Sequence, residues 1–303
     1  MSAFDAYCEL QGTLDGSIQC DERMSRHTTF RIGGPADLFI ECASFADLTT
    51  VLDCLRRHGI RWTVVGKGSN LLVADEGCRC AIITLGSEFR NMHMPEPNLL
   101  VAGAAVPFAS IVQEAFKNAY SGFEFAVGIP GTLGGALSMN AGTRDEWIGS
   151  MVENITMYSP EQGLSKVPSS QIQWAYRRSG IPRDAIVLEA ELRMRPGDPT
   201  SIRAKMEASL KRRKKSQPIG LPSAGSVFRN PPDDSAGRLI ESVGLKGHRI
   251  GGAQISEQHA NFIVNQGNAT AENVVDLVVL ARDRVKEVHG IELRPEVDRK
   301  SVV

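Results

Sequence analysis

The chain has 303 residues, of which 42% are hydrophobic and 23% charged, and this composition indicates a soluble globular protein of two or three domains. Its formal net charge of −1 provides no field that would attract nucleic acid or anionic lipid, and no run approaches the ~18 consecutive apolar residues of a membrane span. The first twenty residues lack the basic start and apolar segment of a secretory signal, so we expect a cytoplasmic protein without nucleic-acid or membrane partners.

The cysteines and histidines show none of the spacings that are typical of metal sites. The six cysteines include no Cys-x-x-Cys pair, and their one close spacing is Cys78-Arg79-Cys80. The six histidines include no His-x-x-x-His pair. We therefore predict neither a metal site nor a disulfide framework.

Residues 1–25 are polar and weakly patterned, and we expect an N-terminal arm. A Gly-Gly-Pro turn at residues 33–35 precedes an alternating apolar segment that is typical of a half-buried strand. A helix then follows, with Ser44 as its N-cap and Gly59 at its C-terminal end. A buried strand at residues 61–65 leads into the first of two glycine-rich loops.

The first glycine-rich loop consists of Gly66, Lys67, Gly68, Ser69, Asn70 and Leu71. It lacks the third glycine of the dinucleotide-binding fingerprint, and an apolar strand-like run follows it where that fingerprint needs a helix. A Rossmann fold is therefore excluded. A turn of this composition can still present several backbone N–H groups to one anion. A plain hairpin turn is the alternative.

The second glycine-rich loop follows a predicted strand at residues 101–106 and a predicted helix at residues 108–119 with Pro107 at its first turn. It has five glycines in the fifteen residues from Gly128 to Gly142. Glycines allow the backbone to approach another element or a ligand closely, and tight packing is the alternative for some of them. Two such loops favour one extended, phosphate-bearing ligand that lies along both.

Strands are predicted at residues 155–158 and 186–194, and the Pro-Gly pair at residues 196–197 marks the main domain boundary. The helix that starts at Ser201 ends in the basic cluster 211–215, which is typical of a solvated helix end.

The C-terminal third predicts a small α+β unit. A short helix is expected near residues 239–243 and a strand at residues 262–264. A long helix follows, with Thr270 as its cap and Gly290 after its end. Residues 291–297 form a terminal strand or loop.

Ser226 lies in the segment Gln217–Pro232, which precedes most of that unit. Six prolines and glycines deny this segment regular structure, so the serine is expected on a stiff loop, where functional side chains are frequent. A structural turn that uses the serine for local hydrogen bonds is the alternative.

Taken together, these motifs resemble the UDP-N-acetylenolpyruvoylglucosamine reductase family. The resemblance extends from Thr28–Asp37 through both glycine-rich loops and Gly225–Phe228 to Arg294–Val297. It implies an α+β, FAD-binding fold of the vanillyl-alcohol oxidase and p-cresol methylhydroxylase type, with a C-terminal α+β substrate-binding domain. The domains that follow are an arm at 1–25, an FAD-binding domain at 26–197 with subdomains at about 26–85 and 86–197, and a substrate-binding domain at 198–303.

The resemblance also implies the activity, which is the NADPH-dependent reduction of UDP-N-acetylglucosamine enolpyruvate to UDP-N-acetylmuramate through bound FAD, in peptidoglycan precursor synthesis. The residues that correspond to catalytic ones are Arg177, Ser226 and Glu296. Those that correspond to substrate-binding ones are Tyr176, Arg212 and Asn230. FAD would be held by the first loop (Gly66, Lys67, Gly68, Ser69, Asn70, Leu71) and by Ile129, Pro130, Gly131, Thr132, Gly134, Gly135, Asn140, Ala141 and Gly142 of the second.

Only 49 positions separate Arg177 from Ser226, which leaves no room for the loop that carries a substrate-capping tyrosine in the longer subclass. The chain therefore resembles the shorter, type II members. We expect a monomer or weak oligomer. Two alternatives stay open, namely another flavin oxidoreductase or oxidase of the same fold and a non-catalytic, nucleotide-sugar-binding flavoprotein.

Overall fold

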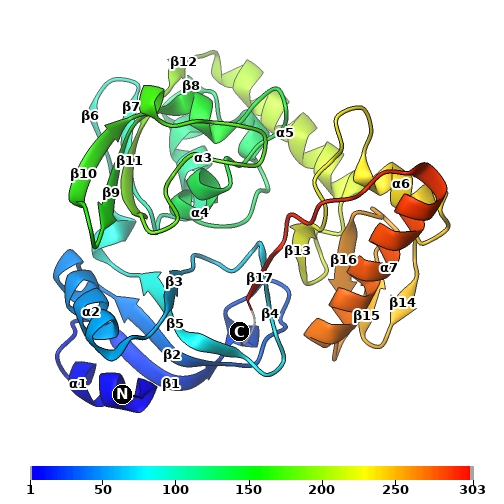
Figure 1. The fold of residues 1–303 in the computed structure, drawn as a ribbon. Helices are drawn as coiled ribbons and strands as arrows, with labels where there is room; N and C mark the ends of the chain where they lie inside the picture. The colour runs from blue at the N-terminus through cyan, green and yellow to red at the C-terminus, as the bar shows by residue number, and fades with distance from the viewer. Residues whose placement is uncertain (1, 301–303) are drawn as a thin grey trace. The chain divides into compact units, whose positions relative to one another are not determined.

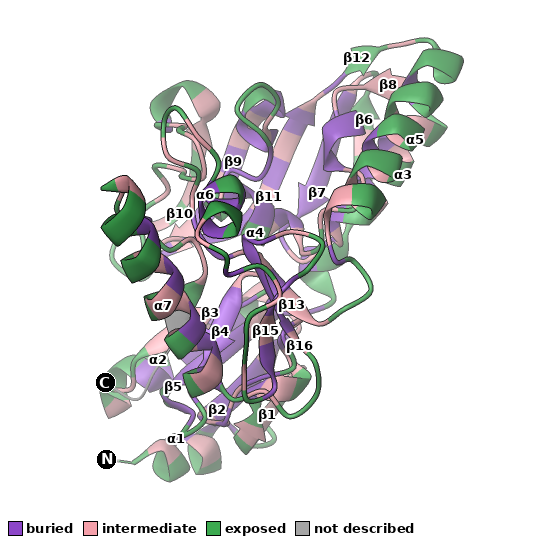
Figure 2. Cartoon of the chain, turned by 90° about the vertical axis from the view of Figure 1, so that its right-hand side faces the viewer, coloured by how far each residue is buried: buried purple, intermediate pink, exposed green. Residues whose placement is uncertain are grey.

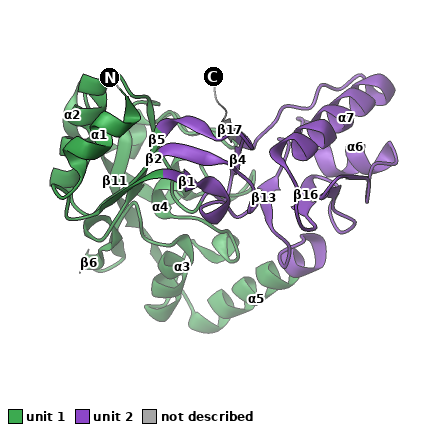
Figure 3. Cartoon of the chain, turned by 90° about the horizontal axis from the view of Figure 1, so that it is seen from below, with its two compact units in different colours: residues 1–20, 38–67, 81–211 green, residues 21–37, 68–80, 212–303 purple. Residues whose placement is uncertain are grey.

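A computed structural model describes residues 2–300, which form two compact units (Figure 3). Unit 1 contains residues 1–20, 38–67 and 81–211, and unit 2 contains residues 21–37, 68–80 and 212–303. Two segments of the N-terminal half, residues 21–37 and 68–80, thus belong to unit 2, whereas the prediction divides the chain in sequence order at residues 25, 85 and 197. Among the described residues, no helix combines the length and the apolar character needed to cross a membrane.

Seven α-helices lie within the described residues (Figure 1). Ser44 and Thr270 accept hydrogen bonds from the first turns of α2 and α7, and Gly59 and Gly290 follow these helices in the left-handed conformation, as predicted. The helices are α1 (Ala3–Leu10), α2 (Phe45–His58), α3 (Phe108–Lys117), α4 (Leu133–Ser138), α5 (Pro199–Ser216), α6 (Ala236–Ser242) and α7 (Ala271–His289).

The strands form three sheets and two short pairs. The first sheet has the order β1 (Ser17–Arg23), β2 (Pro35–Cys42), β5 (Cys78–Leu85), β3 (Trp62–Val64), and the second has the order β10 (Gly163–Pro168), β9 (Val152–Ser159), β11 (Ile186–Arg193), β7 (Leu99–Gly103), β6 (Met92–Glu96). The third has the order β13 (Ser223–Ser226), β16 (Phe262–Asn265), β15 (Ala253–Ile255), β14 (Arg249–Ile250). The two pairs are β12 (Arg195–Pro196) with β8 (Tyr120–Ser121) and β17 (Asp298–Lys300) with β4 (Leu71–Val73).

Each unit has its own hydrophobic core. In unit 1 the five-stranded antiparallel sheet supplies much of the core, because all five residues of β7 are buried and alternate residues of β9 are buried as well (Figure 2). In unit 2 the core lies between the β13–β16–β15–β14 sheet and the helices α6 and α7 (Figure 1). Phe30 and Leu72 from the N-terminal half of the chain complete it.

The structure corrects two of the sequence predictions and excludes the alternative of a hairpin turn at the first glycine-rich loop. Residues 1–25 are not an arm, because α1 and β1 lie there and the capping box of Ser2 and Asp5 starts the helix. Ser226 is not in an irregular loop but ends the short strand β13. The first glycine-rich loop is not a hairpin turn, since β3 pairs with β5 and β4 pairs with β17.

The sequence prediction did not include a pairing between the two closely spaced cysteines. The sulfur atoms of Cys78 and Cys80 are bonded as a disulfide, at the close spacing that the sequence contains. Alternate residues of a strand face the same side, which places both side chains on one face of β5. The pair is local and does not form the disulfide framework of a small secreted protein.

Candidate functional site

Ser226 is held by the pairing of β13 with β16. Ser226 lies opposite Phe262, and a register irregularity separates this pair from the pair of Ser223 with Val264. Ser226 itself is half-buried, whereas Val227 is buried in the core of unit 2. Ser226 therefore lies at the edge of a packed segment and stays partly exposed.

Glu296 lies directly beside the Ser226 segment. Its backbone N–H donates to the carbonyl of Val227 at 2.7 Å, and the N–H of Arg229 donates to the carbonyl of Arg294 at 2.9 Å. These bonds pair residues 294–296 with residues 227–229 in antiparallel fashion. Two of the predicted catalytic residues, 70 positions apart, are thus neighbours in unit 2.

Asn70 joins the first glycine-rich loop to the same place. Its side-chain Nδ2 donates to the carbonyl of Glu296 at 3.1 Å, and its own carbonyl accepts the N–H of Asp298 at 3.0 Å. The parallel pairing of Leu71 with Asp298 continues the contact into β4 and β17. Residues 68–71, Ser226 and Glu296 therefore form one continuous structure within unit 2.

Two glycines of the first loop are required by close backbone contacts. Gly68 has φ +59°, and a Cβ atom on it would lie 2.2 Å from the carbonyl oxygen of His27. A Cβ atom on Gly66 would lie 2.4 Å from Oγ1 of Thr132, which belongs to the second loop. Within unit 1 the two glycine-rich loops therefore adjoin at Gly66 and Thr132, as a ligand shared by both would need.

The exposed part of the second loop surrounds the start of α4. Thr132 caps this helix, while the N–H of Gly134 donates to the carbonyl of Ala104 at 2.9 Å. Gly134 also lets α4 approach β7, because a Cβ atom there would lie 3.0 Å from Cβ of Ala104. Gly135, by contrast, is exposed, and a Cβ atom there would make only an ordinary contact with Oγ1 of Thr132 at 3.7 Å. Small, exposed residues in both loops fit the close approach of a phosphate-bearing cofactor such as FAD.

The end of the second loop is turned inward. Asn140 takes φ +43° just after α4, and its side chain is 3% exposed. Its Nδ2 donates to the carbonyl of Ala175 at 2.9 Å, and its Oδ1 accepts the N–H of Gly149 at 3.1 Å. Ala141 and Gly142 are buried too. Asn140 thus supports the next functional segment, and its contact with a cofactor stays a prediction.

Arg177 lies in the tight turn that Asn140 supports. Ala175 and Arg178 exchange two backbone hydrogen bonds of 2.9 and 3.0 Å, and Arg177 at the turn has φ +56°. This conformation is unfavourable for a residue with a Cβ atom, and such strain is concentrated at functional sites. The guanidinium of Arg177 lies 5.9 Å from the ring centre of Tyr176, within range of a cation–π interaction.

The two remaining predicted substrate-binding residues are exposed. Asn230 accepts the N–H of Ala236 at 3.0 Å through its Oδ1 and so helps to start α6. Arg212 lies near the C-terminal end of α5, next to other exposed basic residues. A solvated helix end and an anion-binding surface both agree with this position.

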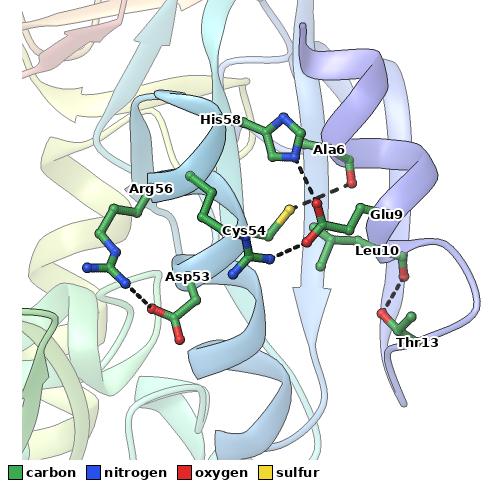
Figure 4. Close-up of polar contacts among 9 residues, drawn as sticks. Ala6, Glu9, Leu10, Thr13, Asp53, Cys54, Arg56 and His58 are labelled. Carbon is green, nitrogen blue, oxygen red and sulfur yellow. Dashed lines mark hydrogen bonds and ion pairs between the residues drawn. The ribbon is translucent and has the colours of Figure 1, made fainter. Parts of the chain in front are cut away.

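Three side chains of α1 and α2 bring donor atoms close together, and the expectation that the chain holds no metal stays a prediction. These atoms, on Glu9, Cys54 and His58, lie within 4.8 Å of one another in the described part of the chain (Figure 4). Each already has a protein contact. Glu9 accepts from His58 at 2.8 Å and pairs with Arg57, and the thiol of Cys54 lies 4.0 Å from the carbonyl of Ala6. The group therefore ties α1 to α2.

The burial of two thiols leads to a testable prediction. Burial raises the pKa of Cys42 to about 12, and burial together with the charge of Glu9 raises the pKa of Cys54 to about 11, so neither forms much thiolate near neutral pH. We expect iodoacetamide to label the exposed Cys8 first and to leave Cys42 and Cys54 unlabelled until the protein is unfolded. Peptide mapping by mass spectrometry measures the order, and early labelling of Cys42 would contradict this packing.

Two known protein families match separate parts of this chain, one around the glycine-rich loops and one around the Ser226 segment. Residues 36–159 match the family described as "FAD binding domain", and residues 217–299 match "UDP-N-acetylenolpyruvoylglucosamine reductase, C-terminal domain". The UDP-N-acetylenolpyruvoylglucosamine reductase of Heliobacterium modesticaldum is 46% identical over 284 residues, which cover 93% of this chain and 90% of that protein. The chain belongs to the UDP-N-acetylenolpyruvoylglucosamine reductase family.

Other members of the reductase family agree over similar lengths. The reductase of Anaeromyxobacter dehalogenans is 43% identical, with 95% of this chain and 87% of that protein covered. The crystal structure of the reductase from Thermus caldophilus has a TM-score of 0.82 and 33% identity, and the match covers 94% of this chain and 99% of that one. The α+β, FAD-binding fold expected from the sequence is therefore confirmed.

One residue of the reductase site was missed in the sequence. Asn261 is 3% exposed and binds the backbone immediately after Ser226. The only signal in the sequence is that Asn261 is a polar residue directly before an apolar strand. Many solvent-facing polar residues occupy such positions, so this signal does not single it out.

Proposed function

We propose that this chain reduces the enolpyruvyl group of UDP-N-acetylglucosamine enolpyruvate to give UDP-N-acetylmuramate, with NADPH as reductant and FAD as bound cofactor, in peptidoglycan precursor synthesis. The observation that carries the proposal is the pairing of the Ser226 and Glu296 segments within a domain of the reductase family. The proposal includes a cytoplasmic location and a monomer or weak oligomer. Product formation tests it directly, because substrate-dependent NADPH oxidation should yield a sugar nucleotide two mass units heavier.

The two glycine-rich loops would hold FAD. The exposed residues Gly66, Lys67 and Gly135 support this role, since a ligand can reach them from solvent. Bound there, FAD would supply the hydride chemistry that links NADPH to the substrate. The protein then has to stabilise the charge that develops on the substrate and to supply a proton.

Arg177 and Glu296 would stabilise that charge. Hydride addition to the terminal carbon places negative charge on the next carbon, and the neighbouring carboxylate shares it. Arg177 is always protonated and can bind a carboxylate through two hydrogen bonds. Glu296 can donate to the same group only in its protonated form. Both interactions strengthen as charge develops, which is the condition for a catalytic effect.

Ser226 would deliver the proton to the carbon next to the carboxylate. A hydroxyl is a weak acid, but its partner here is strongly basic, so transfer is feasible when the donor is held within hydrogen-bond reach. The half-buried position at the end of β13 supports this role, because the pairing with Phe262 holds the residue in place while part of it stays exposed.

Tyr176, Arg212 and Asn230 would bind the sugar nucleotide. We expect Arg212→Ala to raise the KM for the substrate by ~10-fold while flavin reduction by NADPH changes little, since a lost contact to an anion weakens substrate binding alone. Lys205→Ala is the matched control, because Lys205 is an exposed basic residue of the same helix. Equal changes in both variants, measured by steady-state and stopped-flow kinetics, would assign Arg212 to an ordinary helix end.

A further inference from the structure

We infer that Asn261 is a positioning residue, which fixes Ser226 for proton delivery by clamping the backbone of Val227 and Phe228. The inference rests on the proposed role of Ser226. It adds Asn261, which has no part in the mechanism proposed above.

Three hydrogen bonds make the clamp. Oδ1 of Asn261 accepts the N–H of Phe228 at 2.9 Å, and Nδ2 donates to the carbonyl of the same residue at 2.8 Å. The backbone carbonyl of Asn261 accepts the N–H of Val227 at 2.8 Å. One residue thus satisfies three polar groups of the two residues that follow Ser226.

An amide is the one short side chain that can make both side-chain bonds. It presents a donor and an acceptor side by side, as a neighbouring strand would, whereas a carboxylate has no donor and an aliphatic side chain has neither. Asn261 is 3% exposed, so water does not replace a lost bond at little cost. The clamp is therefore rigid and specific for asparagine at this position.

The clamp is itself fixed. The N–H of Asn261 donates to Nδ1 of His259 at 3.2 Å, and burial lowers the pKa of His259, which favours the neutral ring that can accept this bond. Phe262, the next residue along the chain, pairs with Ser226 across β16 and β13. The pairing of β13 with β16 therefore fixes the position of Asn261 relative to Ser226.

Glu296 holds the same segment from the other side, through its N–H to the carbonyl of Val227. Without the side chain of Asn261, Phe228 would lose both of its bonds to residue 261, and on that side only the backbone bond to Val227 and the pairing of Ser226 with Phe262 would remain. Proton transfer requires a donor within hydrogen-bond reach, and a displacement of about 1 Å can lower a rate by ~10²-fold. Flavin reduction by NADPH involves no proton transfer from Ser226 and gives a built-in reference.

The test compares Asn261→Ala with Asn265→Ala in the FAD-loaded, full-length protein. Asn265 lies four residues later, at the end of β16, and its side chain also binds backbone, at Phe30, Gly267 and Ala269, but none of these bonds reaches the Ser226 segment. In Asn261→Ala we expect flavin reoxidation by the substrate to slow by ~10- to 10²-fold, while reduction by NADPH stays within about 2-fold. Asn265→Ala should leave the ratio of the two rates unchanged. Asn261→Asp, which keeps the volume and the acceptor but loses the donor, carries the same comparison if the alanine variant fails to fold.

A second readout does not depend on turnover. Amide hydrogen exchange of Phe228 should accelerate in Asn261→Ala and remain unchanged in Asn265→Ala, because the N–H of Phe228 loses its side-chain acceptor, whereas the N–H of Val227 keeps the backbone carbonyl of residue 261. Unchanged exchange at Phe228 in Asn261→Ala would overturn the clamp.

A double-mutant cycle separates the inference from the proposed function on which it rests. If Asn261 acts through Ser226, adding Asn261→Ala to Ser226→Ala should slow reoxidation little further. If the fold-change in the reoxidation rate of the double variant equals the product of the two single fold-changes, Asn261 acts independently of Ser226, which overturns the inference. A slow Ser226→Ala with a normal Asn261→Ala also overturns the inference alone, whereas a normal Ser226→Ala overturns the proposed role of the serine.

Discussion

Ser226→Ala should reduce its flavin with NADPH at close to the normal rate and then fail to pass the hydride to the substrate. Reoxidation should slow by ~10²–10⁴-fold, the range associated with the loss of a general acid, because no group then protonates the carbon next to the carboxylate. Stopped-flow absorbance of the flavin measures the two steps separately. Ser226→Cys should retain more activity than the alanine variant, since a thiol can donate a proton from nearly the same position.

Ser223→Ala is the matched control for this result. Ser223 begins the same short strand and is also half-buried, but the interaction it provides to Thr29 comes from its backbone carbonyl, which alanine keeps. We expect both half-reactions of Ser223→Ala to remain near normal. Parallel losses of both half-reactions in Ser226→Ala would instead show that the serine shapes β13 and does not deliver a proton.

Gly68→Ala should lower the free energy of unfolding by about 3 kcal/mol and release FAD, because it combines two unfavourable effects. The residue has φ +59°, which costs alanine about 1 kcal/mol, and the new Cβ atom would lie 2.2 Å from the carbonyl oxygen of His27. Backbone at this distance has to move, and the first glycine-rich loop moves with it. Denaturant unfolding and the flavin content of the purified variant measure the two effects.

Gly59→Ala isolates the contribution of the contact. Gly59 has φ +66° after α2, but no atom lies within 4 Å of the position of its Cβ. We expect this variant to lose only about 1 kcal/mol and to retain its FAD. A similar loss in Gly59→Ala and Gly68→Ala would mean that the contact with His27 contributes nothing.

Elements with strong local signals could be predicted from the sequence. The helices α2 and α7 were placed correctly, because a capping residue, an apolar periodicity and a terminal glycine all agreed. The strand β11 was placed from its alternation alone. These signals involve neighbouring residues, and tertiary contacts do not override them.

Contacts between distant segments could not be predicted. The exposed, polar appearance of residues 1–25 conceals α1 and β1, whose stability comes from packing against later segments such as α2. The irregular composition around Ser226 conceals β13, because the pairing with β16 determines this strand. Gly134 stays a predicted cofactor contact, but the sequence did not indicate that its N–H also binds the carbonyl of Ala104.

The site was predictable in its residue types but not in its supports. The motif resemblance identified Ser226 and Glu296, and their backbone pairing places them together in unit 2. Asn70 was expected only at the cofactor, yet its side chain holds the carbonyl of Glu296. Single polar residues that brace a segment from afar, such as Asn261, have no periodicity or spacing that marks them.

The measurement that tests the proposed activity most directly is an anaerobic titration of the purified protein, followed by flavin absorbance. We expect a yellow protein with about one FAD per chain, and we expect NADPH to bleach the flavin. UDP-N-acetylglucosamine enolpyruvate should then restore the colour without oxygen, while it is converted to UDP-N-acetylmuramate. A colourless protein that takes up no added FAD, or a reduced flavin that the enolpyruvyl sugar leaves bleached and that only oxygen reoxidises, would contradict the proposed activity.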